Sequence, residues 1–229
     1  IWLESLKVFK LFNLKYEVKK INNINGVRDS TIPFLISTLL KNNNIFYVAK
    51  NDSELSNIYN FLSHNFEDIH IFKIPAWDCL PYDISSPNFS IVSERIKSFS
   101  KLCFFKKNKE KNIFLTTINA LVTKTAPRGF YKKNFISLTN KTEHSLNTLT
   151  NFLINTGYKR VQTVRELCEF SLRGSILDIF PIGYSKAFRI DFFGQTIETI
   201  KVMDPLTQRS SVHVENINIY SSNEYLLSE

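Results

Sequence analysis

Between residues 45 and 117, short apolar runs alternate with amphipathic segments, and this order constrains the fold more than any other feature of the sequence. The apolar runs have the length of buried strands and lie at 45–49, 69–74 and 112–117. Apolar residues at helical spacing predict helices at 31–40, 51–62 and 90–102. Strands that alternate with helices are typical of a parallel sheet, so we expect a domain of α/β class here.

The pattern changes after Pro127-Arg128-Gly129. A helix is expected at 145–156 and ends at Gly157, which suits the position just after a helix. Strand-like segments follow at 161–165, 173–180, 187–193 and 196–203. We therefore expect a smaller α+β domain inserted into the first, with the α/β domain at 1–126, the inserted domain at 127–212 and a return segment at 213–229.

The loop before the first expected helix occupies the position of a nucleotide-binding loop. Such a P-loop has the pattern GxxxxGK[ST], in which backbone amides and a lysine surround the phosphates. The loop here contains one glycine and no lysine, and an aspartate stands where an anionic phosphate would approach; its residues are Gly26, Arg28, Asp29, Ser30 and Thr31. The sequence predicts a degenerate nucleotide site that binds no cofactor, in a chain that is not an enzyme.

Carboxylates along the later strands leave a metal-dependent nuclease open as an alternative. They are Asp178, Asp191, Glu198 and Asp204. Glu198 and Lys201 are three residues apart and would face opposite sides of a strand, so the Glu-x-Lys spacing of many nucleases is not met. Cys79, Cys103 and Cys168 are widely spaced and form no CxxC pair. This spacing predicts neither a zinc site nor a disulfide framework and fits a reducing cytoplasm.

The chain has a formal net charge of +8, part of it in lysine runs at 106–111 and 132–133. A basic surface binds nucleic-acid backbones without sequence preference, so a DNA-binding module is a second alternative. The abundance of Asn, Ile and Lys also suits an AT-rich genome, in which such charge accumulates without a function. No apolar run reaches the roughly 18 residues of a membrane span, and we expect no membrane partner.

Two stretches are more specific than these patterns. The first is Ile74-Pro75-Ala76-Trp77-Asp78-Cys79-Leu80-Pro81-Tyr82-Asp83, followed by Ser86-Pro87 and Ser93-Glu94-Arg95. The second comprises Arg173-Gly174-Ser175-Ile176-Leu177-Asp178-Ile179-Phe180-Pro181, then Arg189-Ile190-Asp191-Phe192-Phe193-Gly194, Ile197-Glu198 and Asp204-Pro205-Leu206-Thr207-Gln208-Arg209. In this order they resemble the N-terminal, UvrB-homologous module of bacterial transcription-repair-coupling factors, from about residue 21 onward.

The resemblance implies a damage-recognition relative without its chemistry. UvrB has a P-loop and a long DNA-probing hairpin, whereas the loop at Gly26 is degenerate and the segment 75–90 is too short for that hairpin. A UvrB-like ATPase fragment is thus the weakest alternative. In the family the translocase motor and the contacts with RNA polymerase and DNA belong to further domains, so the full-length parent would be an ATP-dependent DNA translocase. This module would recruit UvrA to stalled RNA polymerase in nucleotide excision repair.

The same resemblance places the UvrA-contacting positions at Arg173, Arg189 and Phe193. The period of a strand supports this independently. If Ile190 and Phe192 face the core, Arg189 and Phe193 share the opposite face. An exposed aromatic side chain beside an arginine is the composition of an interface hot spot. A neighbouring loop over Phe193, or burial of both faces of the sheet, would remove this argument.

Overall fold

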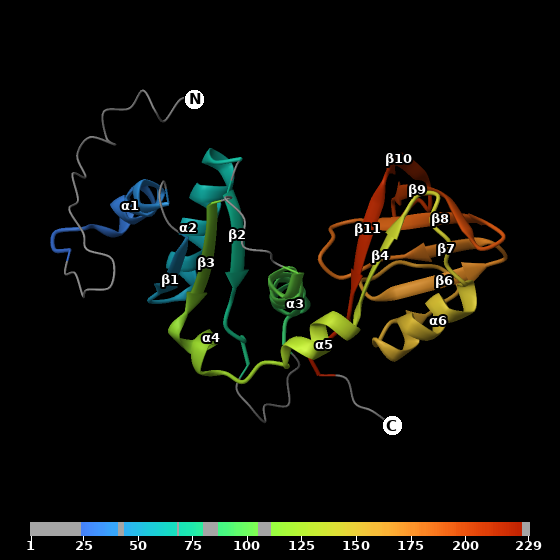
Figure 1. Ribbon diagram of the computed structural model, residues 1–229, viewed down its shortest axis with the longest axis horizontal. Coiled ribbons are helices and arrows are strands. Elements are labelled where there is room, and N and C mark those ends of the chain that lie inside the picture. Colours follow the sequence, from blue (N-terminus) through green and yellow to red (C-terminus); the bar gives the residue numbers. More distant parts are fainter. Residues whose placement is uncertain (1–23, 41–43, 68, 80–86, 105–110, 226–229) are drawn as a thin grey trace. The chain divides into compact units, whose positions relative to one another are not determined.

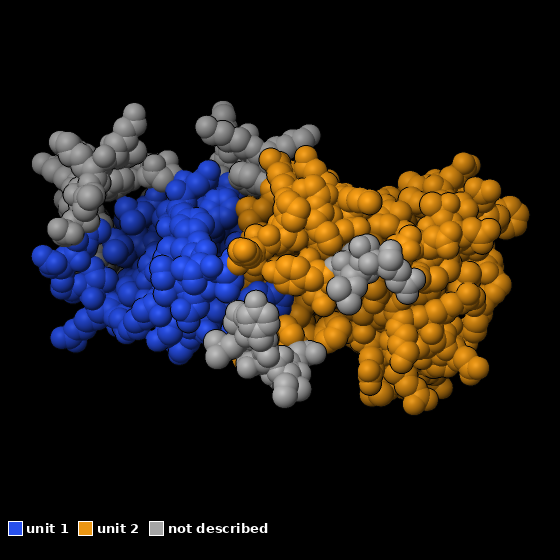
Figure 2. All heavy atoms as spheres, turned by 90° about the horizontal axis from the view of Figure 1, so that it is seen from below, with its two compact units in different colours: residues 1–77, 106–123 blue, residues 78–105, 124–229 orange. Residues whose placement is uncertain are grey.

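The structure, a computed structural model, describes residues 24–40, 44–67, 69–79, 87–104 and 111–225 (Figure 1). The chain divides into two compact units, coloured separately in Figure 2. Unit 1 contains residues 1–77 and 106–123, and unit 2 contains residues 78–105 and 124–229. Parallel and antiparallel sheets are both present, so the mixed α/β character expected from the sequence is confirmed. The relation of unit 1 to P-loop enzymes remains a prediction.

Unit 1 is built on a parallel sheet with the strand order β1-β3-β2. Its elements are η2 (Asp29–Thr31), α1 (Ile32–Leu39), β1 (Ile45–Ala49), α2 (Asp52–Asn65), β2 (Ile69–Ile74), β3 (Lys111–Thr117) and α4 (Ile118–Val122). Cross-strand partners Ile45, Ile113 and Ile71 lie in one row and pack with side chains of α1 and α2, including Ile36 and Leu62. The core of unit 1 therefore lies between these helices and one face of the sheet.

The start of α2 shows how local sequence fixes an element. Asn51 has extended backbone geometry, and its side-chain Oδ1 accepts a hydrogen bond from the Glu54 backbone amide at 2.9 Å. This contact satisfies an amide that the first helical turn leaves without an intrahelical partner. Leu55, Ile58 and Leu62 are then buried along one stripe, which confirms the helical spacing found in the sequence.

Unit 2 contains a six-stranded sheet with the order β10-β9-β8-β7-β6-β5 and a two-stranded sheet of β11 and β4. Its elements are α3 (Phe89–Phe104), α5 (Arg128–Lys133), β4 (Phe135–Thr139), α6 (Leu146–Asn155), β5 (Lys159–Arg160), β6 (Glu169–Arg173), β7 (Ile176–Ile179), β8 (Ala187–Phe193), β9 (Thr196–Met203), β10 (Ser210–Val214) and β11 (Asn216–Tyr220). Pairing from β6 to β10 is antiparallel throughout.

One expected strand is wrong, and a second is confirmed only in part. Residues 161–165 form no strand. Val161 and Val164 belong to a loop and pack on Ala187 and Met203. Their apolar spacing therefore reflects burial of these side chains and not hydrogen bonding to a neighbouring strand. The expected strand 173–180 is confirmed only over β7 (Ile176–Ile179), because the chain turns at Gly174, whose φ is +60°, and Arg173 ends the preceding strand β6. Glycine reaches this backbone region at little cost. The strands expected at 187–193 and 196–203 are confirmed as β8 and β9.

Helix α3 groups with unit 2 and is fastened there by polar contacts. Ser93 Oγ accepts a hydrogen bond from the Gly183 amide at 2.7 Å, and Lys97 Nζ donates to the Gly183 carbonyl at 3.0 Å. Arg95 Nε donates to Glu224 Oε1 at 2.8 Å, and both side chains are fully buried. The motif Ser93-Glu94-Arg95 thus joins α3 to distant parts of the same unit.

The compact units do not follow the boundaries expected from the sequence. Helix α3 lies in the expected first domain but groups with unit 2, and β11, in the expected return segment, pairs with β4 in unit 2. The functional division at 1–126, 127–212 and 213–229 stays a prediction. Within the described ranges, no helix combines the length and apolar character needed to span a membrane.

Candidate protein-docking site

The three expected contact residues lie in unit 2, on the strands β6 and β8. Strand β7 runs between these two strands, and Asp178 of β7 is the direct cross-strand partner of Arg189. Arg173 is the last residue of β6, and Phe193 is the last residue of β8. Residues paired across an antiparallel sheet point to the same face. The face of the six-stranded sheet that carries Asp178 and Arg189 is called the outer face below.

Asp178 binds both arginines. Arg189 donates from Nε to Asp178 Oδ1 at 2.7 Å and from Nη2 to Oδ2 at 2.9 Å, and Arg173 Nη2 donates to Oδ2 at 2.6 Å. The Asp178 side chain is only 1% exposed, whereas that of Arg173 is 55% exposed. A buried carboxylate needs such partners, because an unpaired charge in the interior is strongly unfavourable. Asp178 therefore holds the two guanidinium groups at the surface of the sheet.

The arginines differ in how far the chain itself engages them. Arg189 also donates from Nη1 to the Gln208 carbonyl at 3.3 Å, and its Nη2 lies 3.3 Å from Met203 Sδ. Its hydrogen bonds to Asp178 raise the pKa of the Arg189 guanidinium, although burial opposes the shift. Arg173 has one ion-pair contact and a mostly exposed side chain. Arg173 is thus the better placed of the two to contact a partner, and Arg189 mainly supports the face.

Phe193 is exposed, as its position in the strand period predicts. Ile190 and Phe192 are buried, whereas 78% of Phe193 is accessible. The chain turns at Gly194, whose φ is +62°. The Phe192 amide donates to the Ser175 carbonyl at 2.9 Å, so the turns after Arg173 and Phe193 lie side by side. The structure therefore brings an exposed aromatic ring to the same end of the sheet as Arg173.

A second ion pair continues the charged face beyond Arg189. Lys201 Nζ donates to Asp191 Oδ2 at 3.1 Å, and Thr199 Oγ1 donates to the same oxygen at 2.7 Å. Burial alone would raise the pKa of the Asp191 carboxyl, but these bonds outweigh it and hold the pKa below its usual value. Sequence reasoning missed Lys201 and Thr199 because only strand pairing, Arg189 with Lys201 and Asp191 with Thr199, places them on this face.

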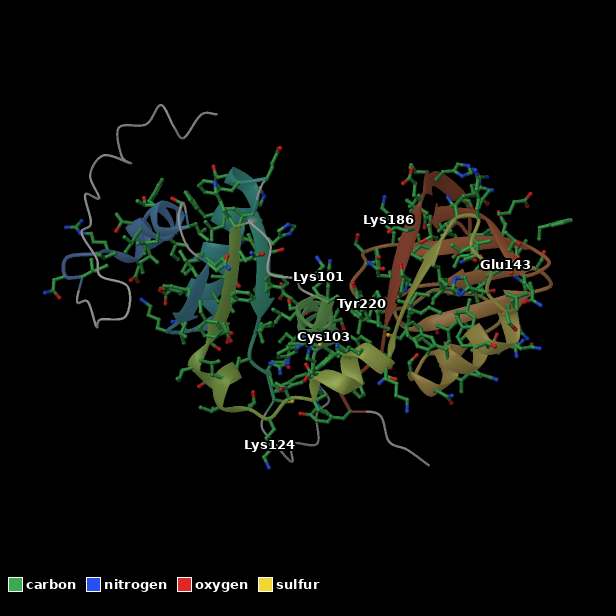
Figure 3. The ribbon with its side chains drawn as sticks, viewed as in Figure 1. Lys101, Cys103, Lys124, Glu143, Lys186 and Tyr220 are labelled. Atoms are coloured by element: carbon green, nitrogen blue, oxygen red, sulfur yellow. The ribbon has the colours of Figure 1, made fainter. Side chains whose placement is uncertain are left out.

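The segment before α6 borders this end of the sheet. Glu143 forms an isolated antiparallel bridge with Thr196, and the His144 amide donates to the Gln195 carbonyl at 2.7 Å. Glu143 is labelled in Figure 3. These backbone contacts hold the β8–β9 turn, which follows Phe193. The aromatic ring therefore lies next to a supported turn.

Three of the four carboxylates weighed for a nuclease have separate partners. Asp178 binds arginines, Asp191 binds Lys201 and Thr199, and Asp204 Oδ1 accepts from the Leu206 amide at 2.8 Å. In the part of the chain that the structure describes, no group of three or more His, Cys, Asp or Glu side chains is arranged to hold a metal ion. The arrangement of these aspartates gives the nuclease alternative no support.

The loop expected to be a degenerate nucleotide site lies in unit 1. Gly26 has a φ of +79°, and Arg28 and Thr31 exchange hydrogen bonds before α1 begins. The Asp29 carboxylate forms an ion pair with Lys50. Ser30 lies between Asp29 and Thr31 in the short helix η2. The negative charge of Asp29 is thus placed just before the start of α1.

Comparisons with known proteins bear on unit 2 and on most of the chain. Residues 136–225 match the family model described as the UvrB interaction domain. The chain is 32% identical over 197 residues to the transcription-repair-coupling factor of Rickettsia bellii (strain RML369-C), which covers 85% of this chain and 17% of the relative. It is 31% identical over 189 residues to that of Haemophilus influenzae (strain ATCC 51907 / DSM 11121 / KW20 / Rd), covering 81% of this chain and 16% of the relative.

The chain is similar to the transcription-repair-coupling factors, and residues 136–225 are similar to the UvrB interaction domain. The factor of Escherichia coli (strain K12) is 29% identical over 160 residues, covering 70% of this chain and 14% of the relative. The resemblance found in the sequence motifs is confirmed. The chain spans about one sixth of the length of these relatives. The matched residues 136–225 include Arg173, Arg189 and Phe193.

Proposed function

We propose that this chain is a docking module that recruits UvrA in transcription-coupled nucleotide excision repair. One observation carries the proposal. The exposed Phe193 lies at the same end of the outer face as Arg173, which Asp178 orients, and both residues are inside the segment that matches the UvrB interaction domain. In the longer parent protein, the module would bring UvrA to a stalled RNA polymerase. Contacts with polymerase and DNA, and ATP-driven translocation, would belong to other domains of that protein.

The chemistry of the face supports binding to a protein. Aromatic and arginine side chains dominate interface energies, and their removal commonly costs about 2 kcal/mol or more. Arg173 is already oriented by Asp178, so less side-chain entropy is lost when a partner binds. Phe193 supplies apolar area at the same end. The oriented guanidinium of Arg173 and the exposed ring of Phe193, at one end of the sheet, are suited to one defined partner.

We further propose that the chain has no ATPase activity of its own. The ion pair of Asp29 with Lys50 supports this, because both charges engage each other next to the start of α1. An anionic phosphate approaching this position would meet the Asp29 carboxylate. Replacing Asp29 by Gly would remove that charge, yet the loop would still lack the lysine of a P-loop.

Calorimetry with the cognate UvrA tests the docking role. We expect the chain to bind, and the double variant Arg173→Ala/Phe193→Ala to bind at least about 30-fold more weakly, the factor that matches about 2 kcal/mol. A matched control is Lys159→Ala/Ile154→Ala, which removes a cation and an exposed apolar side chain from β5 and α6. Equal affinity of the two double variants would overturn the assignment of the site.

The remaining alternative is a non-specific DNA-binding module, which the net charge of +8 favours. Exposed Arg128, Lys132 and Lys133 all lie on the short helix α5, whereas the lysines at 106–110 lie outside the described residues. Fluorescence anisotropy with a labelled DNA duplex at several salt concentrations distinguishes the two roles. DNA affinity that falls steeply with salt, in a chain that does not bind UvrA, would favour the alternative.

A further inference from the structure

The turn between β9 and β10, residues 204–209, is tied down by its own hydrogen bonds. Asp204 Oδ1 accepts from the amides of Leu206 at 2.8 Å and Thr207 at 3.4 Å. The Asp204 amide donates to the Arg209 carbonyl at 3.0 Å, and the Gln208 amide donates to the Asp204 carbonyl at 2.8 Å. A carboxylate that accepts from amides two and three residues ahead fixes a turn locally. This 204–209 turn is therefore preorganised.

The side chain of Gln208 fastens the 204–209 turn to the body of unit 2. Its Nε2 donates to the Val164 carbonyl at 2.9 Å and to the Pro205 carbonyl at 2.6 Å. Gln208 itself has a φ of +60°, a left-handed geometry that is uncommon outside glycine. The surrounding contacts must hold such a residue in place. The hydrogen bond from Gln208 to the Val164 carbonyl thus holds the turn against the loop that contains Val164.

Leu206 lies in this supported turn and is 90% exposed, the highest exposure among the large hydrophobic side chains of the described residues. Single exposed leucines are common and need no explanation by themselves. Here the backbone on both sides of the leucine is hydrogen-bonded. Binding would therefore immobilise little of the chain, and the apolar contact would be realised at low entropic cost.

The 204–209 turn is connected to the candidate docking site through Arg189. The Gln208 carbonyl accepts from Arg189 Nη1 at 3.3 Å, and the same guanidinium binds Asp178. Phe193 is four residues from Arg189 along β8, a separation of roughly 13 Å at the usual rise of a strand. Leu206 belongs to the opposite end, where β9 leaves its pairing with Ala187. Two exposed apolar side chains therefore flank the arginines.

We propose that Leu206 is a second apolar anchor of the UvrA-docking surface and enters an apolar pocket on that partner. The inference rests on the proposed function, because it names a further contact of the same interface. One anchor and one arginine fix a point of attachment, whereas two separated anchors also fix the direction in which the partner lies across β8 and β9. Interfaces concentrate energy in such anchors while the contacts around them exclude water.

The test compares Leu206→Ser with Ile154→Ser by calorimetry against cognate UvrA. Both substitutions shorten an exposed branched aliphatic side chain, and Ile154 lies on α6 with 50% exposure. Because Leu206 is almost fully exposed, its replacement leaves the core intact, which circular dichroism verifies. We expect about tenfold weaker binding for Leu206→Ser and no change for Ile154→Ser. Equal affinity of Leu206→Ser and the parent chain would overturn the inference.

Asp204→Ala probes the preorganisation without altering the leucine. Loss of the carboxylate frees the amides of Leu206 and Thr207, so we expect faster hydrogen exchange at these amides and weaker binding of UvrA. Faster exchange with unchanged affinity would show that the rigid turn does not contribute, which contradicts the inference.

The outcomes separate this inference from the proposed function. If Arg173→Ala/Phe193→Ala weakens binding and Leu206→Ser does not, the docking role stands and the second anchor is wrong. If both weaken binding, both are supported. If the parent chain does not bind UvrA at all, the proposed function fails, and the second anchor fails with it.

Discussion

Arg189 and Asp178 face each other across strands β8 and β7 and form a two-point ion pair, with distances of 2.7 and 2.9 Å. Arg173 reaches the same carboxylate from β6 at 2.6 Å. The carboxylate is almost fully buried, whereas the side chains of Arg173 and Arg189 are 55% and 21% exposed. One buried anion thus supports two surface cations, and their substitutions have different consequences.

Arg189→Ala is expected to destabilise unit 2 by about 2–3 kcal/mol, less than the full cost of breaking a buried pair because Arg173 still contacts Asp178. Arg173→Ala should cost less than about 1 kcal/mol, since the arginine is mostly exposed and Asp178 keeps its two-point partner. Urea unfolding followed by far-UV circular dichroism measures both variants. Equal losses of stability would contradict this division of roles. For this reason Arg173→Ala is the cleaner probe of binding.

Titration of the Asp191 carboxyl should make the free energy of unfolding depend on pH. Hydrogen bonds from Thr199 and Lys201 outweigh burial and depress the pKa of the carboxyl in the folded chain. A depressed pKa means that the stabilisation is present above the unfolded value, about 3.9, and is lost as pH falls through the folded value. The free energy of unfolding, measured from pH 2.5 to 6, should therefore be higher for the parent than for Asp191→Asn at pH 6. The two curves should converge in acid; parallel curves would refute the assignment.

Strand period was sufficient to predict the exposure of Phe193, because burial of Ile190 and Phe192 depends only on local alternation. The role of Asp178 could not be predicted in the same way. Its partners are five and eleven residues away in the sequence, and pairing of β6, β7 and β8 brings them together. Without that pairing, Asp178 had no identified partner, and a metal-ligand role stayed open as a minor alternative.

Long-range burial accounts for the other differences between expectation and structure. Val161 and Val164 alternate as strand residues do, yet they pack from a loop onto Ala187 and Met203. Ser93 and Arg95 of α3 were read as part of a family motif. Their partners, Gly183 and Glu224, lie 90 and 129 residues away. Such contacts have no local signal, because their energy appears only when distant segments are packed together.

Gly183→Ala tests the contact between α3 and the loop before β8. Gly183 has a φ of +87°, and an added Cβ would lie 3.3 Å from Lys97 Cδ, whereas a Cβ at Gly174, with a φ of +60°, would meet nothing within 4 Å. Both alanine variants carry left-handed strain of about 1–2 kcal/mol. We expect Gly183→Ala to lose more stability in urea unfolding, because Lys97 is also held by the Gly183 carbonyl. Adding Lys97→Ala should recover the difference; equal losses in the two single variants would show that the lysine simply moves aside.

The buried pair of Arg95 and Glu224 gives the sharpest test of how α3 is held in unit 2. Both side chains have 0% exposure and their atoms lie 2.8 Å apart. Arg95→Met leaves the Glu224 carboxylate buried without its cation, so unit 2 should lose about 3–5 kcal/mol. The double variant Arg95→Met/Glu224→Met removes both charges at similar volume and should recover most of that loss, since apolar side chains often replace a buried pair with little cost. Urea unfolding of the single and double variants decides the matter. If the double variant is as unstable as Arg95→Met, the other packing of Arg95 along α3, including its position 5.4 Å over the Phe99 ring, matters more than the charge pair.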